Sequence, residues 1–205
     1  ALLGALRSPK QEGEIGRFGL GFKSVLEITD TPQIFSFSGS FGFDKSRSAG
    51  LIGENFEEHY QNIPVLRLAW PLDINNEKAN DDTISELMTW ASTIVKLPFD
   101  RDVDLKFLDE ELDRFPREFL LFTDHVNQLI LENRVRSPAT KRIISRAKED
   151  GIVSILDSAD RQSRTDWNVF TTSHDLTDEG RADANQQHRD RGAIPIVWAV
   201  PRAGR

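Results

Sequence analysis

The sequence contains no cysteine, so disulfide bonds and thiolate metal sites are excluded. Histidine is also scarce, and its four copies lack the paired spacing of a zinc site: His59, His125, His174 and His188. No apolar run approaches the roughly 20 residues that cross a bilayer, and no basic segment followed by an apolar one begins the sequence. These absences favour a globular protein without a membrane partner, and we expect a cytoplasmic location.

Positive charge is in short supply as well. The chain has 26 Lys and Arg against 33 Asp and Glu, which gives a formal net charge of −7 at pH 7. Surfaces that bind nucleic acid or anionic membranes need clustered Lys and Arg, so we expect neither as the main partner. A length of 205 residues with 38% hydrophobic residues is enough for one large domain or two small ones.

Three glycines lie close together near the start of the chain, inside an apolar, helix-prone run: Gly16, Gly19 and Gly21. Glycine places no Cβ between the backbone and a ligand, so such a stretch at the start of a helix can direct bare N–H groups at a phosphate. The alternative is a tight turn whose glycines allow close packing. The spacing alone favours neither hypothesis.

The residues around these glycines decide between the two hypotheses. The stretch Ile15-Gly16-x-Phe18-Gly19-x-Gly21-Phe22-x-Ser24 closely resembles the second glycine box of the Bergerat-fold (GHKL) ATPases, which include gyrase, the ninety-kilodalton heat-shock chaperones, histidine kinases and MutL. With Thr29-Asp30-Thr31-Pro32 after it, the run is most similar to the sacsin amino-terminal ATP-binding domain and its bacterial relatives. A weaker similarity continues through residues 93–98 to 198–201.

The resemblance implies which residues contact ATP. The implied phosphate-binding residues are Lys10 in the lid and Gly16, Arg17, Phe18, Gly19, Leu20, Gly21 and Phe22 in the glycine box. The weaker nucleotide-binding candidates are Lys23, Ser24 and Thr93. Thr93 opens a strand whose threonine holds the adenine end in this superfamily, although the usual preceding glycine is Ser92 here. Without the resemblance, Lys10 is a solvated loop lysine and Thr93 an ordinary strand residue.

Several superfamily ligands have no match in this sequence. These are the glutamate that activates water, the asparagine that holds Mg²⁺ and the D-x-G-x-G turn that holds adenine, because only 13 residues precede Glu14. We therefore interpret the chain, which begins at Ala1 without an initiator methionine, as a fragment starting after the adenine-binding turn. ATP and Mg²⁺ are the expected cofactors, the metal ligands and any targeting signal are expected to lie outside the chain, and no catalytic residue is assigned within it.

Apolar patterning predicts an α+β fold. A hairpin is expected from strands at 33–37 and 41–43, followed by strands at 65–70 and 93–97, with an exposed charged connection at 75–82. An amphipathic helix is predicted over 104–119, capped by Asp102 or Asp104 and interrupted by Pro116. Five further strands are predicted at 129–131, 141–146, 152–156, 167–171 and 193–200, with a hairpin turn at Asp150-Gly151.

These elements predict two domains. Residues 1–104 are expected to be the carboxy-terminal part of a Bergerat α/β sandwich, with lid and glycine box. Residues 105–205 are expected to be a connecting helix and the start of a sheet-rich middle domain. We expect the apolar stripe of that helix, which includes Leu105 and Phe119, to pack on the sheet that precedes it.

The leading functional hypothesis is ATP binding, with or without hydrolysis, in a sacsin- or heat-shock-chaperone-like protein whose conformation is gated by the nucleotide. Protein clients or partner domains are the expected macromolecular partners, and the oligomeric state is left open. The alternative is a non-hydrolysing interaction or scaffold module that retains the fold. A MutL- or gyrase-like DNA machine is disfavoured by the acidic balance of the chain.

We predict that the isolated 205-residue chain binds ATP weakly, because phosphate contacts alone must compete with water when the adenine and magnesium ligands are missing. Isothermal titration calorimetry with ATP and Mg²⁺ measures this directly. A submicromolar, magnesium-dependent affinity would contradict the interpretation that essential ligands lie outside the chain.

Overall fold

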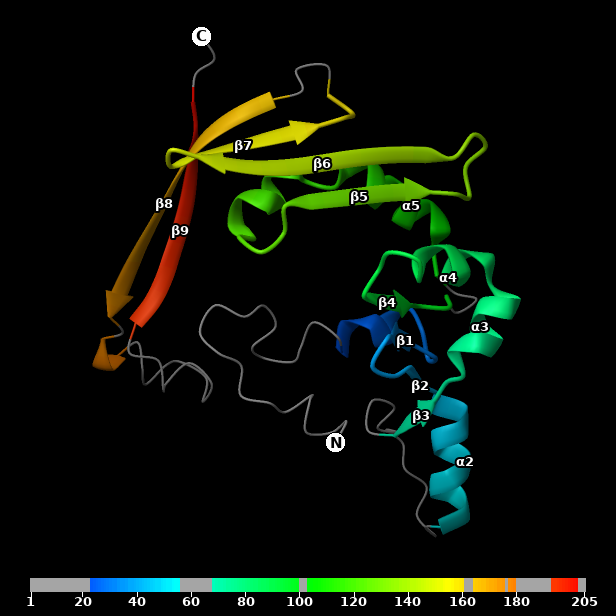
Figure 1. Ribbon diagram of the computed structural model, residues 1–205. Helices are drawn as coiled ribbons and strands as arrows, with labels where there is room; N and C mark the ends of the chain where they lie inside the picture. Colours follow the sequence, from blue (N-terminus) through cyan, green and yellow to red (C-terminus); the bar gives the residue numbers. More distant parts are fainter. Residues whose placement is uncertain are drawn as a thin grey trace. The chain divides into compact units, whose positions relative to one another are not determined.

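The computed structural model describes residues 23–55, 68–99, 103–160, 164–175, 177–179 and 193–202 (Figure 1). The chain divides into two compact units, Ala1–Val103 and Asp104–Arg205. Each unit contains one antiparallel sheet with helices, so the expected α+β class is confirmed. In the part of the chain that is described, no helix combines the length and the apolar character needed to cross a membrane.

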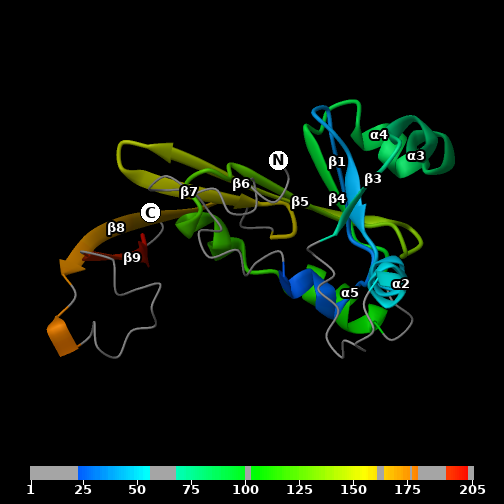
Figure 2. The ribbon, with the colours of Figure 1, turned by 90° about the horizontal axis from the view of Figure 1, so that it is seen from below.

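The first unit is built on a four-stranded sheet. Its strands are β1 (Gln33–Ser36), β2 (Phe41–Phe43), β3 (Ala69–Pro71) and β4 (Thr93–Lys96). Their order is β3-β2-β1-β4, with every pairing antiparallel. The helices are η1 (Lys23–Glu27), α2 (Lys45–Asn55), α3 (Ile74–Asn80) and α4 (Asp82–Leu87) (Figure 2). The predicted hairpin and the strand that begins at Thr93 are confirmed.

Helix α3 occupies most of the stretch at 75–82 that we expected to be an exposed connection, and α4 begins at its last residue, so the stretch has no buried residue but is helical and not a loop. Each helix begins at an aspartate whose carboxylate accepts hydrogen bonds from backbone N–H groups of its first turn. Asp73 accepts from Asn75 N at 2.9 Å, and Asp81 accepts from Thr83 N at 3.0 Å and from Ile84 N at 3.2 Å. Because the segment is short and charged, apolar periodicity gave no signal of a helix there.

Helix α4 covers one face of the first sheet. Phe35 of β1 and Ile94 of β4 are cross-strand partners, and both are buried with Ile84 and Met88 from the α4 region. Side chains alternate between faces along a strand, so Thr93 and Val95 lie on the opposite face. The sheet therefore has one face in the core and a second face that carries Thr93.

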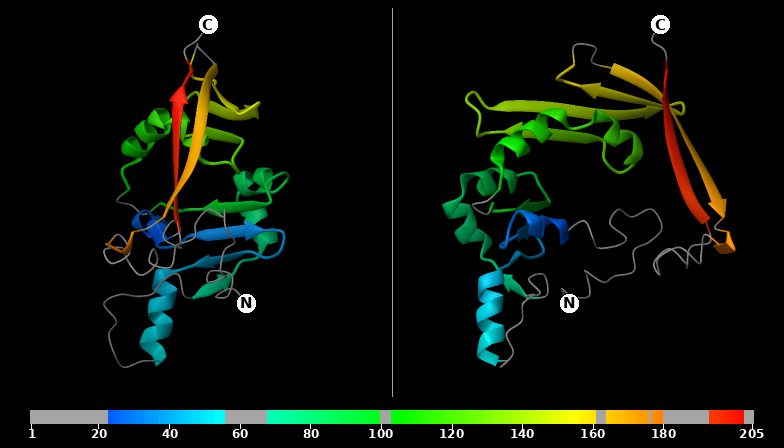
Figure 3. Two further views of the ribbon diagram at one scale, coloured as in Figure 1. Left: turned by 90° about the vertical axis from the view of Figure 1, so that its left-hand side faces the viewer. Right: turned by 180° about the vertical axis from the view of Figure 1, so that it is seen from behind.

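The second unit is a five-stranded sheet that curls into a half-barrel (Figure 3). Its strands, in spatial as well as chain order, are β5 (Gln128–Asn133), β6 (Thr140–Glu149), β7 (Ile152–Asp157), β8 (Arg164–Asp175) and β9 (Ala193–Pro201). All five predicted strands are confirmed. The turn between β6 and β7 has positive φ at both residues, +49° at Asp150 and +79° at Gly151, as a two-residue hairpin requires.

The helix at the start of the second unit is shorter than predicted. Helix α5 (Leu105–Arg114) begins at Asp104, whose carboxylate accepts from Lys106 N and Phe107 N, and it ends two residues before Pro116. A 3-10 helix, η3 (Arg117–Phe122), follows. Proline cannot donate the hydrogen bond that would continue the α-helix, which explains the early end.

The apolar stripe predicted for a helix over 104–119 is exposed at both of its ends. Leu105 is 52% exposed and Phe119 is 44% exposed. Phe115 packs against the core of the second unit, and α5 contacts β5, so this part of the stripe serves the sheet that follows. That core joins η3 to the concave face of the sheet through its fully buried members Leu120, Leu121, Ile144, Val153 and Ile155.

We predict that Asp81→Ala destabilises the first unit, because Asp81 caps α4 and also accepts from Lys96 Nζ at 2.8 Å, which ties the helix to β4. Loss of an N-cap carboxylate costs about 1 kcal/mol in the free energy of unfolding. Urea denaturation measures the change. Asp82→Ala, one residue later in the first turn, is the control, and an equal loss in both variants would contradict the capping role.

Candidate functional site

The expected phosphate site lies outside the described residues. This holds for Lys10, Gly16, Arg17, Phe18, Gly19, Leu20, Gly21 and Phe22. The structure therefore bears on the site only through the elements that follow it in the chain. Those elements contain the three weaker candidates, Lys23, Ser24 and Thr93.

Lys23 and Ser24 are the first two residues of η1. The helix closes with hydrogen bonds from Ile28 N and Thr29 N to Val25 O, both 3.1 Å long. Thr29 is fully buried, and its hydroxyl accepts from Thr31 N at 3.1 Å. The segment that follows the glycine box is thus fixed in the first unit at Thr29, just before β1 begins.

Thr93 opens β4 and pairs with Ser36 of β1 at one edge of the first sheet. Its side chain is exposed, and it shares its sheet face with Val95, which is 49% exposed. Ile34 and Phe41 lie on the same face, because the register places Ile34 opposite both Val95 and Phe41. The Thr93 hydroxyl is therefore accessible on the face opposite to α4.

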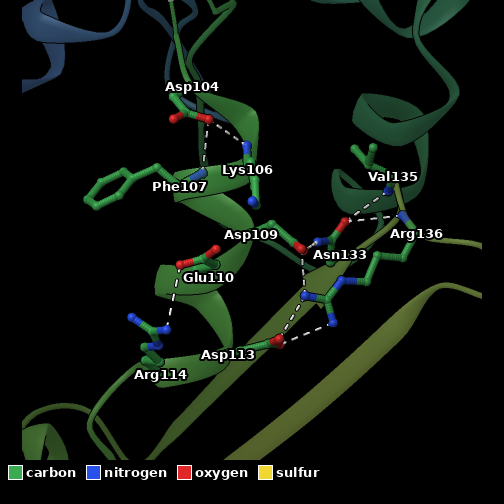
Figure 4. A network of polar contacts seen from close by, with 10 residues as sticks. All are labelled: Asp104, Lys106, Phe107, Asp109, Glu110, Asp113, Arg114, Asn133, Val135 and Arg136. Atoms are coloured by element: carbon green, nitrogen blue, oxygen red, sulfur yellow. Dashed lines mark hydrogen bonds and ion pairs between the residues drawn. The ribbon is translucent and has the colours of Figure 1, made fainter.

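The most extensive polar network joins α5 to the loop after β5 in the second unit, and Figure 4 shows it. Arg136 Nη2 lies 2.6 Å from Asp109 Oδ2 and 2.7 Å from Asp113 Oδ2. The hydrogen bonds that the Arg136 guanidinium donates to Asp109, the larger cause, and to Asp113 raise its pKa. Asn133 completes the network, since its amide donates to Asp109 and its carbonyl accepts from Val135 N.

Two residues of the acidic run Asp109-Glu110-Glu111 form ion pairs within the second unit. Asp109 pairs with Arg136, and Glu110 Oε2 lies 3.6 Å from Arg114 Nη2. Nowhere in the described residues do three metal-ligating side chains form a group that could hold a metal ion.

A second ion pair is more deeply buried. Arg142 Nε and Nη2 donate to the two carboxylate oxygens of Asp157 at 3.0 and 2.6 Å, and the exposed fractions of their side chains are 17% and 3%. Arg142 also donates to Asp113 O at 2.9 Å, and Ala159 N donates to Asp157. The Arg142 hydrogen bond lowers the pKa of Asp157. This pair joins β6, β7 and the end of α5.

These two networks hold α5, β6, β7 and the loop after β5 together. Both guanidinium groups, Arg136 and Arg142, already hold carboxylates, so neither offers an unpaired cation to a phosphate. The sequence did not predict these contacts, because the two arginines and their partners are 15 to 29 residues apart and no local spacing rule covers that separation.

Comparison with known protein families, with curated proteins and with solved structures found no match to this chain.

We predict that Asp157→Asn lowers the free energy of unfolding by about 3 kcal/mol near neutral pH, because it leaves Arg142 buried without its countercharge. The folded-state pKa of Asp157 lies below its unfolded value of about 3.9, so the contribution of the pair is present above that pH and is lost as the pH falls through the folded-state pKa.

Denaturant unfolding of the wild type and the variant between pH 7 and pH 2 measures this difference. The stability gap should narrow below about pH 4. Asp113→Asn, at an exposed carboxylate on α5, is the control. A gap that stays constant down to pH 2 would show that the Asp157 charge does not stabilise the fold.

Proposed function

We propose that this chain forms part of a Bergerat-type ATP-binding domain in a protein similar to sacsin and the heat-shock chaperones. In this proposal, nucleotide binding changes the conformation of the first unit and the second unit responds. The observation that carries the proposal is the glycine box at residues 15–24, in which apolar residues and Ser24 flank three glycines at the spacing of that superfamily.

The fold that follows the box supports the proposal. The box, residues 15–24, ends within the short helix η1, and η1 leads directly into strand β1 of the antiparallel sheet. Thr93 lies at the edge of that sheet with an exposed side chain, on the face opposite to α4. This is a position where a ligand can reach its hydroxyl without displacing the core.

The roles proposed for the box residues follow from backbone chemistry. Gly16, Gly19 and Gly21 would present N–H groups to the phosphates, since only glycine allows the backbone to approach that closely. Lys10 and Arg17 would add positive charge, which assists phosphate binding in a chain of net charge −7. Mg²⁺ would neutralise part of the negative charge of the phosphates. The resemblance places the protein ligands of Mg²⁺ in the sequence that precedes the glycine box.

A second candidate function is a non-hydrolysing interaction module with the same fold. The region before the glycine box distinguishes the two candidates, because the resemblance places the water-activating glutamate and the magnesium-binding asparagine there. The two functions differ in a measurable way, because only the first releases inorganic phosphate from ATP. Steady-state phosphate release by the full-length gene product distinguishes them.

We predict that Gly19→Val and Gly21→Val abolish ATP binding by the full-length gene product, with at least a hundredfold loss of affinity. A β-branched side chain would occupy the space of the phosphates and disfavour positive φ. Calorimetric titration with ATP and Mg²⁺ measures the affinity.

The matched control is Gly50→Val in α2, because nothing lies within 4 Å of a Cβ built at Gly50. Circular dichroism checks that each variant is folded. If Gly19→Val and Gly21→Val remain folded and bind ATP as tightly as Gly50→Val, the glycines serve packing and the phosphate-binding proposal is wrong.

A further inference from the structure

Strand β9 stands at the edge of the second sheet and carries no charge. Its nine residues, Ala193–Pro201, include no Asp, Glu, Lys or Arg, although 29% of the whole chain is charged. In the described part of the chain, no strand pairs with its outer edge. An uncharged edge strand in an acidic chain calls for a physical explanation.

The outer parts of β8 and β9 form a ribbon of only two strands. Strand β7 pairs with β8 as far as Asn168, and beyond it β8 pairs with β9 alone among the described strands. Figure 1 shows the two strands continuing together past β7. Two strands by themselves are marginally stable in water, so a further strand would stabilise this ribbon.

One face of the ribbon is an exposed apolar stripe. Trp167, Val169 and Ala199 on the opposite face pack against the core, so the stripe points away from it. The stripe consists of Phe170, Ile196, Trp198 and Val200, which are 44–46% exposed. The Phe170 and Trp198 rings stack with their centroids 5.8 Å apart.

The hydrogen-bonding direction of β9 follows from one contact. Arg202 N donates to Asp166 O at 2.8 Å, which makes this register pair a hydrogen-bonded one. The backbone N–H and C=O groups of alternate residues in an antiparallel strand point to opposite edges. The N–H and C=O groups of the even-numbered residues of β9 therefore face β8, and those of the odd-numbered residues face the outer edge. Among the described residues no strand accepts from the N–H groups on this edge, which belong to Ala193, Val197 and Ala199 because Pro195 and Pro201 have none.

We propose that β9 pairs antiparallel with β9 of a second copy of this chain, about a two-fold axis at Val197. Val197 then faces Val197, Pro195 faces Ala199, and Ala193 faces Pro201. In this register each of the three N–H groups on the outer edge meets a carbonyl, and both proline carbonyls accept a hydrogen bond. Prolines usually protect an edge strand, and here they leave no buried donor unpaired.

Side chains also match in this register. Ile196 lies beside Trp198 of the second copy on the exposed stripe, and Trp198 lies beside the second Ile196. Aromatic and β-branched residues are favourable cross-strand partners, whereas like charges directly opposite one another are destabilising. Because β9 has no charged side chain, two chains of net charge −7 can pair here without local repulsion.

Sedimentation equilibrium of the full chain tests the association, and the expected result is a mass that doubles as concentration rises. Val197→Lys should weaken the association at least tenfold, because it places two ammonium groups opposite each other on the axis. Thr171→Lys is the matched control, since Thr171 pairs directly with Val197 but lies one strand farther from the axis. Circular dichroism verifies that both variants are folded.

A conservative variant locates the axis. Since the chain has no cysteine, Val197→Cys introduces a single thiol. Residues opposite one another in a hydrogen-bonded pair have Cα atoms about 5.5 Å apart, within the range of a disulfide. Mild oxidation should therefore cross-link Val197→Cys and leave Thr171→Cys monomeric. A chain that stays monomeric at about 100 μM, where any dimer of micromolar Kd (about −8 kcal/mol) is populated, would overturn the proposal, as would equal cross-linking of both variants.

Discussion

Each sheet of this protein buries one face beneath a helical element, and this constraint decides which surfaces remain for function. In the first unit, α4 covers the face of β1 and β4 that carries Phe35 and Ile94. In the second, η3 covers the concave face that carries Ile144 and Val153. An antiparallel sheet has two faces and two edges, so a helix on one face leaves the edges and the exposed residues of the other face accessible.

Charged groups hold the covering elements in place. Asp81 begins α4 and binds Lys96 on β4, so a single carboxylate sets both the start of the helix and its place on the sheet. In the second unit, Arg142 joins Asp157 to the end of α5, and Arg136 joins the loop after β5 to the same helix. These contacts explain why the conspicuous charged clusters are structural.

Both proposals involve residues away from these two buried faces. Thr93 is exposed on the face of the first sheet opposite to α4, and its strand pairs with β1. Strand β9 lies at the open edge of the second sheet. Thr93 presents a polar side chain, whereas β9 presents an uncharged strand edge.

The sequence by itself determined the local elements and the functional hypothesis. Alternation of apolar residues located the hairpin and all five strands of the second sheet, and Asp150-Gly151 located a turn because both residues need positive φ. The glycine box also depends on a local pattern, the spacing of its glycines together with the residues that flank them. Such features are readable because their physical causes lie within a few residues of one another.

Tertiary structure decided the rest. The charged segment after Asp73 forms two helices, and α5 ends before Pro116. Phe115 packs against the core of the sheet that follows it. Tertiary structure also paired Arg142 with Asp157, and it left the outer edge of β9 open among the described strands. These outcomes depend on contacts between residues far apart in the chain, and the free energy of such contacts is set by burial and geometry that no local pattern encodes.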